Sequence, residues 1–236
     1  MPKALRPSSI KLKQFSDDVL LVALAIRTAY LVDAIQVAEN PDIPVFEDVT
    51  LWHDPSSSQT FFVNVSLLSK TYRDLQSSEP PWTAFIRLNE PPTLAPGNIV
   101  QVLADIVTQT FNNPISVISS QELTQDLMIP VAAILLEYPV AYVPTSGAGD
   151  QTAFLSRELL DVYECLLMNA GIGTHNRHTL MKFSCPNVIG VEHTELSPHR
   201  LIERMKERFV PRLQVVDSHT TLDIQVLAGK FDRVAL

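Results

Sequence analysis

The sequence predicts a mixed α/β fold, in which a mostly central β-sheet is flanked by helices and the strands of the C-terminal third are hairpin-like. Three observations predict it. Short β-prone runs alternate with helical patterns over the first two thirds of the chain. Nearer the C-terminus, β-prone runs follow one another with loops between them. Apolar residues make up 46% of the chain and charged residues 19%, which is the composition of a globular protein with a sizeable core.

The chain is expected to form one domain behind a short lead. Residues 1–15 are interpreted as a flexible N-terminal lead and residues 16–236 as a single α/β domain, because the 236 residues show no internal repeat and no low-complexity tract. The apolar runs 19–26 and 129–136 are far shorter than the roughly 20 residues that a membrane-spanning helix needs. We therefore predict no transmembrane segment.

The first elements are predicted from capping residues and apolar runs. Ser16 is a good N-cap for a helix that ends near Arg27. The run 29–37 is apolar and β-prone, and predicts a buried strand. The runs 47–52 and 60–65 then predict two strands that pair as a hairpin with a loop between them.

The middle of the chain predicts alternating helices and strands. Ser66 is the expected cap of a short helix that ends at Leu75, and residues 83–88 are the expected next strand. The strongest helical pattern covers residues 96–111. Its apolar side chains recur at helical spacing on one face: Ile99, Val100, Leu103, Ile106, Val107 and Phe111.

A further strand, helix and strand are predicted before residue 145. Residues 115–118 are the expected strand, and Ser119 with Glu122 forms the pattern of a capping box for the next helix. Pro130 is expected to break or kink that helix. Residues 140–143 are the strand that follows.

The C-terminal third is expected to contain several strands and one clear helix. Ser197 and Pro198 are typical of a helix start, and Pro211 is expected to end that helix. The first two strands should pair as a hairpin, and the last should have one wet face because apolar and polar residues alternate along it. The predicted strands are 162–168, 179–184, 213–216 and 221–226.

Charge and cysteine content exclude several classes of protein. The formal charge is -8 at pH 7, so we expect neither nucleic acid nor an anionic membrane surface as a partner. Cys165 and Cys185 lie in apolar runs and are expected to be buried free thiols, with Cys185 about opposite Asp161 in the hairpin. This predicts a soluble cytoplasmic protein, with the nucleus as the other compartment. The acid-free first 16 residues leave a mitochondrial presequence as an alternative.

One turn-rich loop is the best candidate for a ligand site. It follows a predicted strand, and small residues there can bring backbone N–H groups close to a phosphate. It lacks both the third glycine of a dinucleotide fingerprint and the lysine of a P-loop, and Asp150 adds a negative charge, so a plain surface loop is the favoured interpretation. Candidate ligand-binding residues are Asp33, Tyr142, Thr145, Ser146, Gly147 and Gly149.

The other reactive side chains match no known catalytic or metal pattern. His175, His178 and His193 do not have the spacing of a zinc site, and the first two fall in a predicted exposed loop. Their roles stay open. Cys165 lies in what is expected to be a core strand, which favours a buried thiol over a nucleophile. We predict no metal and no cofactor.

Four short segments occur in an order that resembles a eukaryotic family, the domain of unknown function 4504. They are Ala29–Asp33, Glu137–Tyr142, Lys182–Pro186 and Val234–Leu236. The resemblance spans nearly the whole chain, although the spacer between Asp33 and Pro96 does not resemble the family. It implies a conserved α/β domain without an established activity, and it carries over no catalytic residue.

The sequence leads to two hypotheses about function. The first is a non-enzymatic protein-interaction or assembly domain, because the sequence has many core residues but shows no group of polar residues expected to come together in a site. The second is an enzyme, a hydrolase or a nucleotide-binding protein, with a site near Asp33 and the 145–152 loop. The sequence identifies neither the protein partner nor the oligomeric state.

Overall fold

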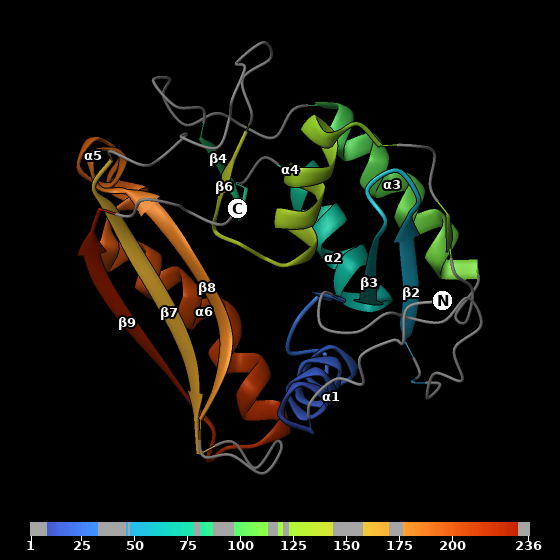
Figure 1. The fold of residues 1–236 in the computed structure, drawn as a ribbon, viewed down its shortest axis with the longest axis horizontal. Helices are drawn as coiled ribbons and strands as arrows, with labels where there is room; N and C mark the ends of the chain where they lie inside the picture. The colour runs from blue at the N-terminus through green and yellow to red at the C-terminus, as the bar shows by residue number, and fades with distance from the viewer. Residues whose placement is uncertain are drawn as a thin grey trace, which may run out of the picture.

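The fold is mixed α/β, as predicted, with its strands distributed over three small sheets (Figure 1). The computed structural model describes residues 9–32, 46, 48–77, 81–86, 97–112, 118–119, 123–143, 158–169 and 177–230. No helix within these residues is both long enough and apolar enough to cross a membrane.

The first sheet has four strands in the order β1-β3-β2-β5. The predicted hairpin is confirmed: β2 and β3 are antiparallel and place Trp52 opposite Phe61. The short β1 pairs antiparallel with β3, and β5 pairs parallel with β2. The strands are β1 (Ala29–Leu31), β2 (Val49–Asp54), β3 (Gln59–Asn64) and β5 (Ile118–Ser119).

Helices cover both faces of this first sheet because successive side chains of a strand point to opposite faces. Trp52 and Phe61 pack with residues of α2 (Val65–Gln76), α3 (Gly97–Asn112) and α4 (Gln125–Leu135). Phe62 packs on the other face against α1 (Ser9–Ala23), where the ring of Phe15 lies 5.9 Å from the ring of Phe62.

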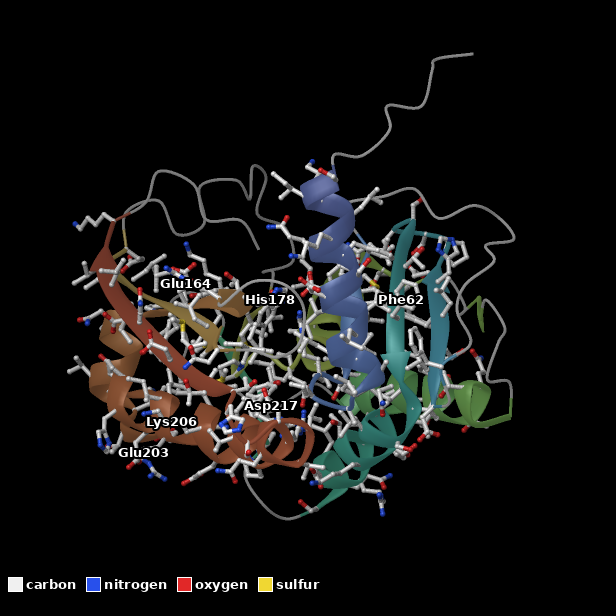
Figure 2. All side chains as sticks on the ribbon, turned by 90° about the horizontal axis from the view of Figure 1, so that it is seen from below. Phe62, Glu164, His178, Glu203, Lys206 and Asp217 are labelled. Atoms are coloured by element: carbon white, nitrogen blue, oxygen red, sulfur yellow. The ribbon has the colours of Figure 1, made fainter. Side chains whose placement is uncertain are left out.

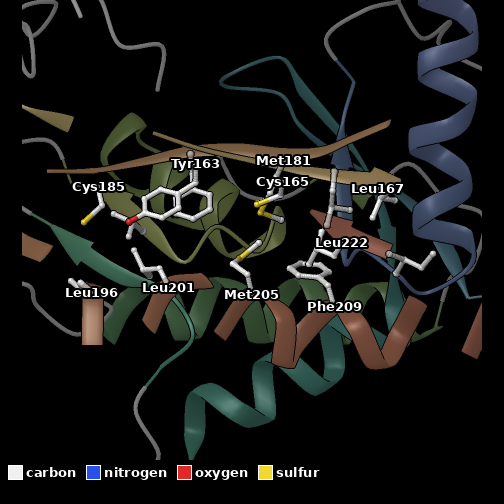
Figure 3. Close-up of a cluster of buried hydrophobic side chains, with 14 of the residues drawn as sticks. Tyr163, Cys165, Leu167, Met181, Cys185, Leu196, Leu201, Met205, Phe209 and Leu222 are labelled. Atoms are coloured by element: carbon white, nitrogen blue, oxygen red, sulfur yellow. The ribbon is translucent and has the colours of Figure 1, made fainter. Parts of the chain in front are cut away.

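The C-terminal part is a three-stranded antiparallel sheet with a long helix packed on one face (Figure 3). The strand order is β8-β7-β9. The buried stripe of the helix is Leu201, Met205, Phe209 and Leu213. The elements are β7 (Leu160–Met168), β8 (Arg177–Pro186), α5 (Asn187–Glu192), a 3₁₀ turn (Thr194–Leu196), α6 (Pro198–Val216) and β9 (Thr221–Gly229). Below, this sheet with α6 is called the C-terminal layer pair.

Two short parallel strands, β4 (Ala84–Ile86) and β6 (Val140–Tyr142), lie between the two main cores. On β4, Phe85 belongs to the core of the first sheet and Ile86 to the core of the C-terminal layer pair. On β6, Ala141 belongs to the core of the first sheet and Tyr142 to the core of the C-terminal layer pair. The β4–β6 pair is therefore buried on both faces, which is typical of parallel strands.

Three predicted helix starts are wrong. The helix predicted from Ser16 begins at Ser9, and the Ser16 hydroxyl donates to the carbonyl of Leu12, 2.9 Å away, inside the helix. Asn64 rather than Ser66 caps α2, because its side-chain oxygen accepts from the N–H of Leu67. Ser119 lies in β5, and α4 begins after Thr124. For α2 and α4, a different polar residue, Asn64 or Thr124, lies directly before the helix.

Pro211, which was expected to end a helix, and Pro130, which was expected to break or kink one, both lie inside helices. The helix α4 continues through Pro130, and α6 continues through Pro211 to Val216, so the predicted strand 213–216 is helical. Pro211 removes one backbone hydrogen bond, but Leu213 extends the buried stripe by another turn. The gain from burying that turn outweighs the loss.

The strand predictions are closer to the structure. Strand β2 runs two residues further than predicted, and β1 ends at Leu31. Residues 33–37 of the predicted run 29–37, Asp33 among them, lie outside the described residues. Cys185 lies opposite Asp161, as predicted, after a bulge between Cys165 and Leu166. The apolar C-terminal residues 234–236 also lie outside the described part of the chain.

Candidate functional site

Tyr142 is the one predicted ligand-binding residue that the structure describes. It is buried on β6, and its hydroxyl donates to the carbonyl of Ser184 on β8 over 3.1 Å. Burial raises the pKa of Tyr142, and the hydrogen bond to Ser184 offsets part of that rise. The phenol is thus a buried contact between β6 and β8. Asp33, Thr145, Ser146, Gly147 and Gly149 lie outside the described residues, so the enzymatic hypothesis stays a prediction.

The histidines that were considered as metal ligands are not gathered at one place in the described structure. His178 lies on β8 rather than in an exposed loop, and its Nε2 is 3.1 Å from a carboxylate oxygen of Asp18 on α1 (Figure 2). His193 is 3.7 Å from Glu195, and His175 lies outside the described residues. Among the residues described, no group of three metal-ligating side chains occurs.

Both cysteines are buried free thiols, as predicted. Burial raises the pKa of Cys165 and of Cys185 to about 12, and the charges of Glu164 and Asp161 respectively add to the effect. Because the thiolate is the reactive form of cysteine, neither sulfur is set up as a nucleophile.

We expect both thiols to resist alkylation in the folded protein at neutral pH. Iodoacetamide should leave Cys165 and Cys185 unmodified over a time in which it fully modifies them in urea, because burial both blocks access and disfavours the thiolate. Intact-protein mass spectrometry measures the modification. Rapid labelling of either thiol in the native state would contradict the buried positions.

A buried carboxylate that the sequence did not single out organises the contact between the two main cores. Glu137 is 0% exposed. Its Oε1 accepts from Arg208 Nε at 2.7 Å and from Arg212 Nη2 at 3.0 Å. Its Oε2 accepts from Arg212 Nη1 at 3.0 Å and from the backbone N–H of Thr28 at 2.8 Å. Both oxygens are therefore engaged twice, and the group is a structural anchor rather than an open ligand site.

The backbone conformation of Glu137 shows how strongly this position is held. Glu137 has φ of 58°, in the left-handed region that favours glycine. It follows Leu136, the C-cap residue of α4, and the N–H of Tyr138 donates to the carbonyl of Ala133, which closes a Schellman motif. A glutamate at this position costs backbone strain, which its four side-chain hydrogen bonds offset.

Trp82 extends this contact along α6. The guanidinium of Arg208 lies 4.5 Å from the ring centre of Trp82, and that of Arg204 lies 5.2 Å from it. Trp82 Nε1 donates to the carbonyl of Glu137, and Arg204 donates to the carbonyl of Trp82. Arg204, Arg208 and Arg212 thus form one side of α6, which faces the first sheet's part of the molecule.

The opposite side of α6 has no such cover among the described residues. Each residue of a helix is turned by about 100° from the one before it. The residue just before each member of the buried stripe therefore faces Trp82 and Glu137, and the residue just after each member faces the opposite side. Ile202 and Val210 occupy those following positions and are only partly buried. Since Tyr142 ties β8 to β6, the β8 edge of the sheet is on the Trp82 side, and Ile202 and Val210 are on the β9 side.

Strand β9 forms the edge of the sheet on that same side (Figure 1). Leu222 is buried beneath the sheet, while Ile224 and Val226 are partly buried on the same inner face. Asp223 and Leu227 are exposed on the outer face, Leu227 by 70%, which confirms the predicted wet face. We call the outer edge of β9 together with Ile202, Val210, Ile224 and Val226 the open side.

The chain matches one family model, and that match covers most of its length. The model is described as Domain of unknown function (DUF4504), and it matches residues 61–232. The matched range includes Glu137, its arginine partners and the open side. No curated protein and no solved structure matches the chain.

Proposed function

For this chain, which belongs to the family described as Domain of unknown function (DUF4504), we propose the role of a non-enzymatic protein-interaction or assembly domain. We further propose that it acts in a reducing compartment, the cytoplasm or the nucleus. The two buried free thiols support that compartment. The observation that carries the proposed function is the open side.

The open side has the features of a strand-binding surface. Strand β9 has nine residues, contains neither proline nor lysine, and pairs with β7 without a register shift. Edge strands of soluble proteins are usually protected by such residues, by bulges or by a covering segment, because an unprotected edge offers a ladder of hydrogen-bonding groups. Many interaction domains use such an edge to add a strand from a partner.

The ionisable groups near the main cores support a non-enzymatic role. Glu137 is saturated by its two arginines, and the carboxylate of Asp161 accepts from the side chain of Asn187 at 3.1 Å. His178 contacts Asp18. Each of these groups joins two elements of the fold, so each has a structural reason for its position.

Replacing Leu227 with aspartate is expected to remove the partners of the protein without unfolding it. Leu227 is 70% exposed on the outer face of β9, so the substitution costs the fold little, but it replaces an apolar cross-strand contact with a negative charge beside the edge that a partner strand would pair with. The measurement is quantitative co-purification of tagged wild-type and L227D chains from cells, with thermal unfolding to verify the fold.

Val215→Asp is the matched control. Val215 is 88% exposed near the C-terminal end of α6, on the side of the helix that faces away from the open side. We expect it to keep the partners that Leu227→Asp loses. Equal retention or equal loss of every partner in both variants would contradict the open side as the binding surface.

A further inference from the structure

We propose that the open side binds a second copy of this chain about a two-fold axis, with β9 antiparallel to the β9 of that copy. The inference rests on the proposed function, since it names the partner of the same surface. The two copies together would form one continuous six-stranded sheet, twice the three strands of the C-terminal layer pair.

The two layers of the open side favour a second copy over an isolated peptide strand. A peptide paired with β9 would cover Ile224 and Val226 from the edge but would leave Ile202 and Val210 of α6 partly exposed. A second copy brings a helix together with its strand. Its α6 would lie on the same face of the joined sheet, so apolar side chains of both layers would be covered at once.

The sequence of β9 is complementary to itself in the antiparallel direction. With the axis at Gln225, Ile224 of one copy faces Val226 of the other on the inner face. β-Branched side chains pack well as such cross-strand pairs. On the outer face Asp223 faces Leu227, so no two like charges are opposed. The two Asp223 carboxylates would be four residues apart along the strands, about 13 Å, which is beyond the screening length at physiological salt.

The helices are compatible with the same axis. A two-fold axis that passes near Lys206 would place Ile202 of one α6 beside Val210 of the other, because the two helices would run antiparallel. Lys206 lies midway between Ile202 and Val210 in the sequence and is exposed; Figure 2 labels it on α6. Its long stem can cover apolar surface while its ammonium group stays in water.

Size-exclusion chromatography with light scattering on the full chain tests the inference. The wild type should have twice the chain mass of 26.3 kDa and dissociate on dilution. Leu227→Asp should weaken the dimer and Leu227→Lys should strengthen it, because residue 227 faces Asp223 of the other copy. Residue 227 meets Asp223 of the other copy twice in the symmetric dimer, so we expect Leu227→Asp to raise Kd and Leu227→Lys to lower it, each by about two- to thirty-fold. Val215→Asp should leave Kd unchanged.

Opposite effects of the two substitutions at Leu227 would support this dimer, because a loss of apolar contact alone would weaken it in both variants. A monomer at every concentration would overturn the inference, as would equal weakening by both substitutions. If the chain is monomeric but Leu227→Asp still removes other partners from cells, the second copy is excluded while the proposed function stands. If no partner depends on Leu227, the proposed function fails as well.

Discussion

Glu137→Gln should lower the free energy of unfolding by about 3–5 kcal/mol, the usual cost of removing one partner of a buried ion pair. Glutamine keeps the shape of the side chain but removes the charge, which leaves Arg208 and Arg212 largely buried without a counter-charge. Urea unfolding at neutral pH, followed by circular dichroism, measures the change. Glu195→Gln is the control, since Glu195 is 67% exposed and its replacement should have little effect.

The effect of Glu137→Gln should depend on pH in a definite direction. Burial alone would raise the pKa of Glu137, but the charges and hydrogen bonds of Arg208 and Arg212 outweigh burial and hold the pKa below its ordinary value of 4.5. The carboxylate therefore stabilises the fold fully above that value, and its contribution is lost as the pH falls through the lowered folded value. Wild type and variant should converge in acid. If the free energies of unfolding of wild type and Glu137→Gln do not differ at neutral pH, or differ by the same amount at every pH, Glu137 does not stabilise the fold as an ionised carboxylate.

Phe209→Ala should lower the free energy of unfolding by a similar amount, about 3–5 kcal/mol. Phe209 is fully buried on α6, beneath the sheet side chains drawn in Figure 3. Its ring also packs edge-on against Trp82 at 6.4 Å, and the guanidinium of Arg212 lies 5.4 Å from it. Truncation therefore opens a cavity where the C-terminal layer pair meets the Glu137 contact. Urea unfolding measures the loss.

Phe209→Leu separates cavity formation from other effects of the change. Leucine fills most of the space, so we expect a loss below about 1.5 kcal/mol. Both variants should retain their circular dichroism spectrum in the absence of urea. Equal losses for alanine and leucine would show that ring contacts with Trp82 and Arg212, rather than filled volume, set the contribution of Phe209.

The parts of the fold that follow from local patterns were predictable from the sequence. Ser197 and Pro198 predicted the start of α6, and the turn-bounded runs predicted both hairpins. The end of α6 was not predictable, because Pro211 is a local signal for stopping while the burial of Leu213 is a tertiary effect. The capping serines failed for the same reason: a polar residue suits a cap only where packing begins the helix.

The two features that carry the functional argument depend on long-range placement. Arg204 and Arg208 are one turn apart in the predicted helix, but the expected stop at Pro211 left Arg212 outside it, and nothing local indicates which of the 26 acidic residues the arginines meet. Alternation along β9 predicted its two faces. Its position at the sheet edge follows from the strand order β8-β7-β9, and a single strand's pattern does not contain that order.

The anchor at Glu137 also bears on how the protein leaves the ribosome. Arg208 follows Glu137 by 71 residues and Arg212 by 75, so the nascent chain carries this acid without its counter-charges until α6 has been translated. Strand β7 stays without its partner β9 for longer still, because β9 is translated after α6. The first sheet can therefore assemble early, but the interface between the cores closes only near the end of translation. Truncated or stalled products should be clients of chaperones.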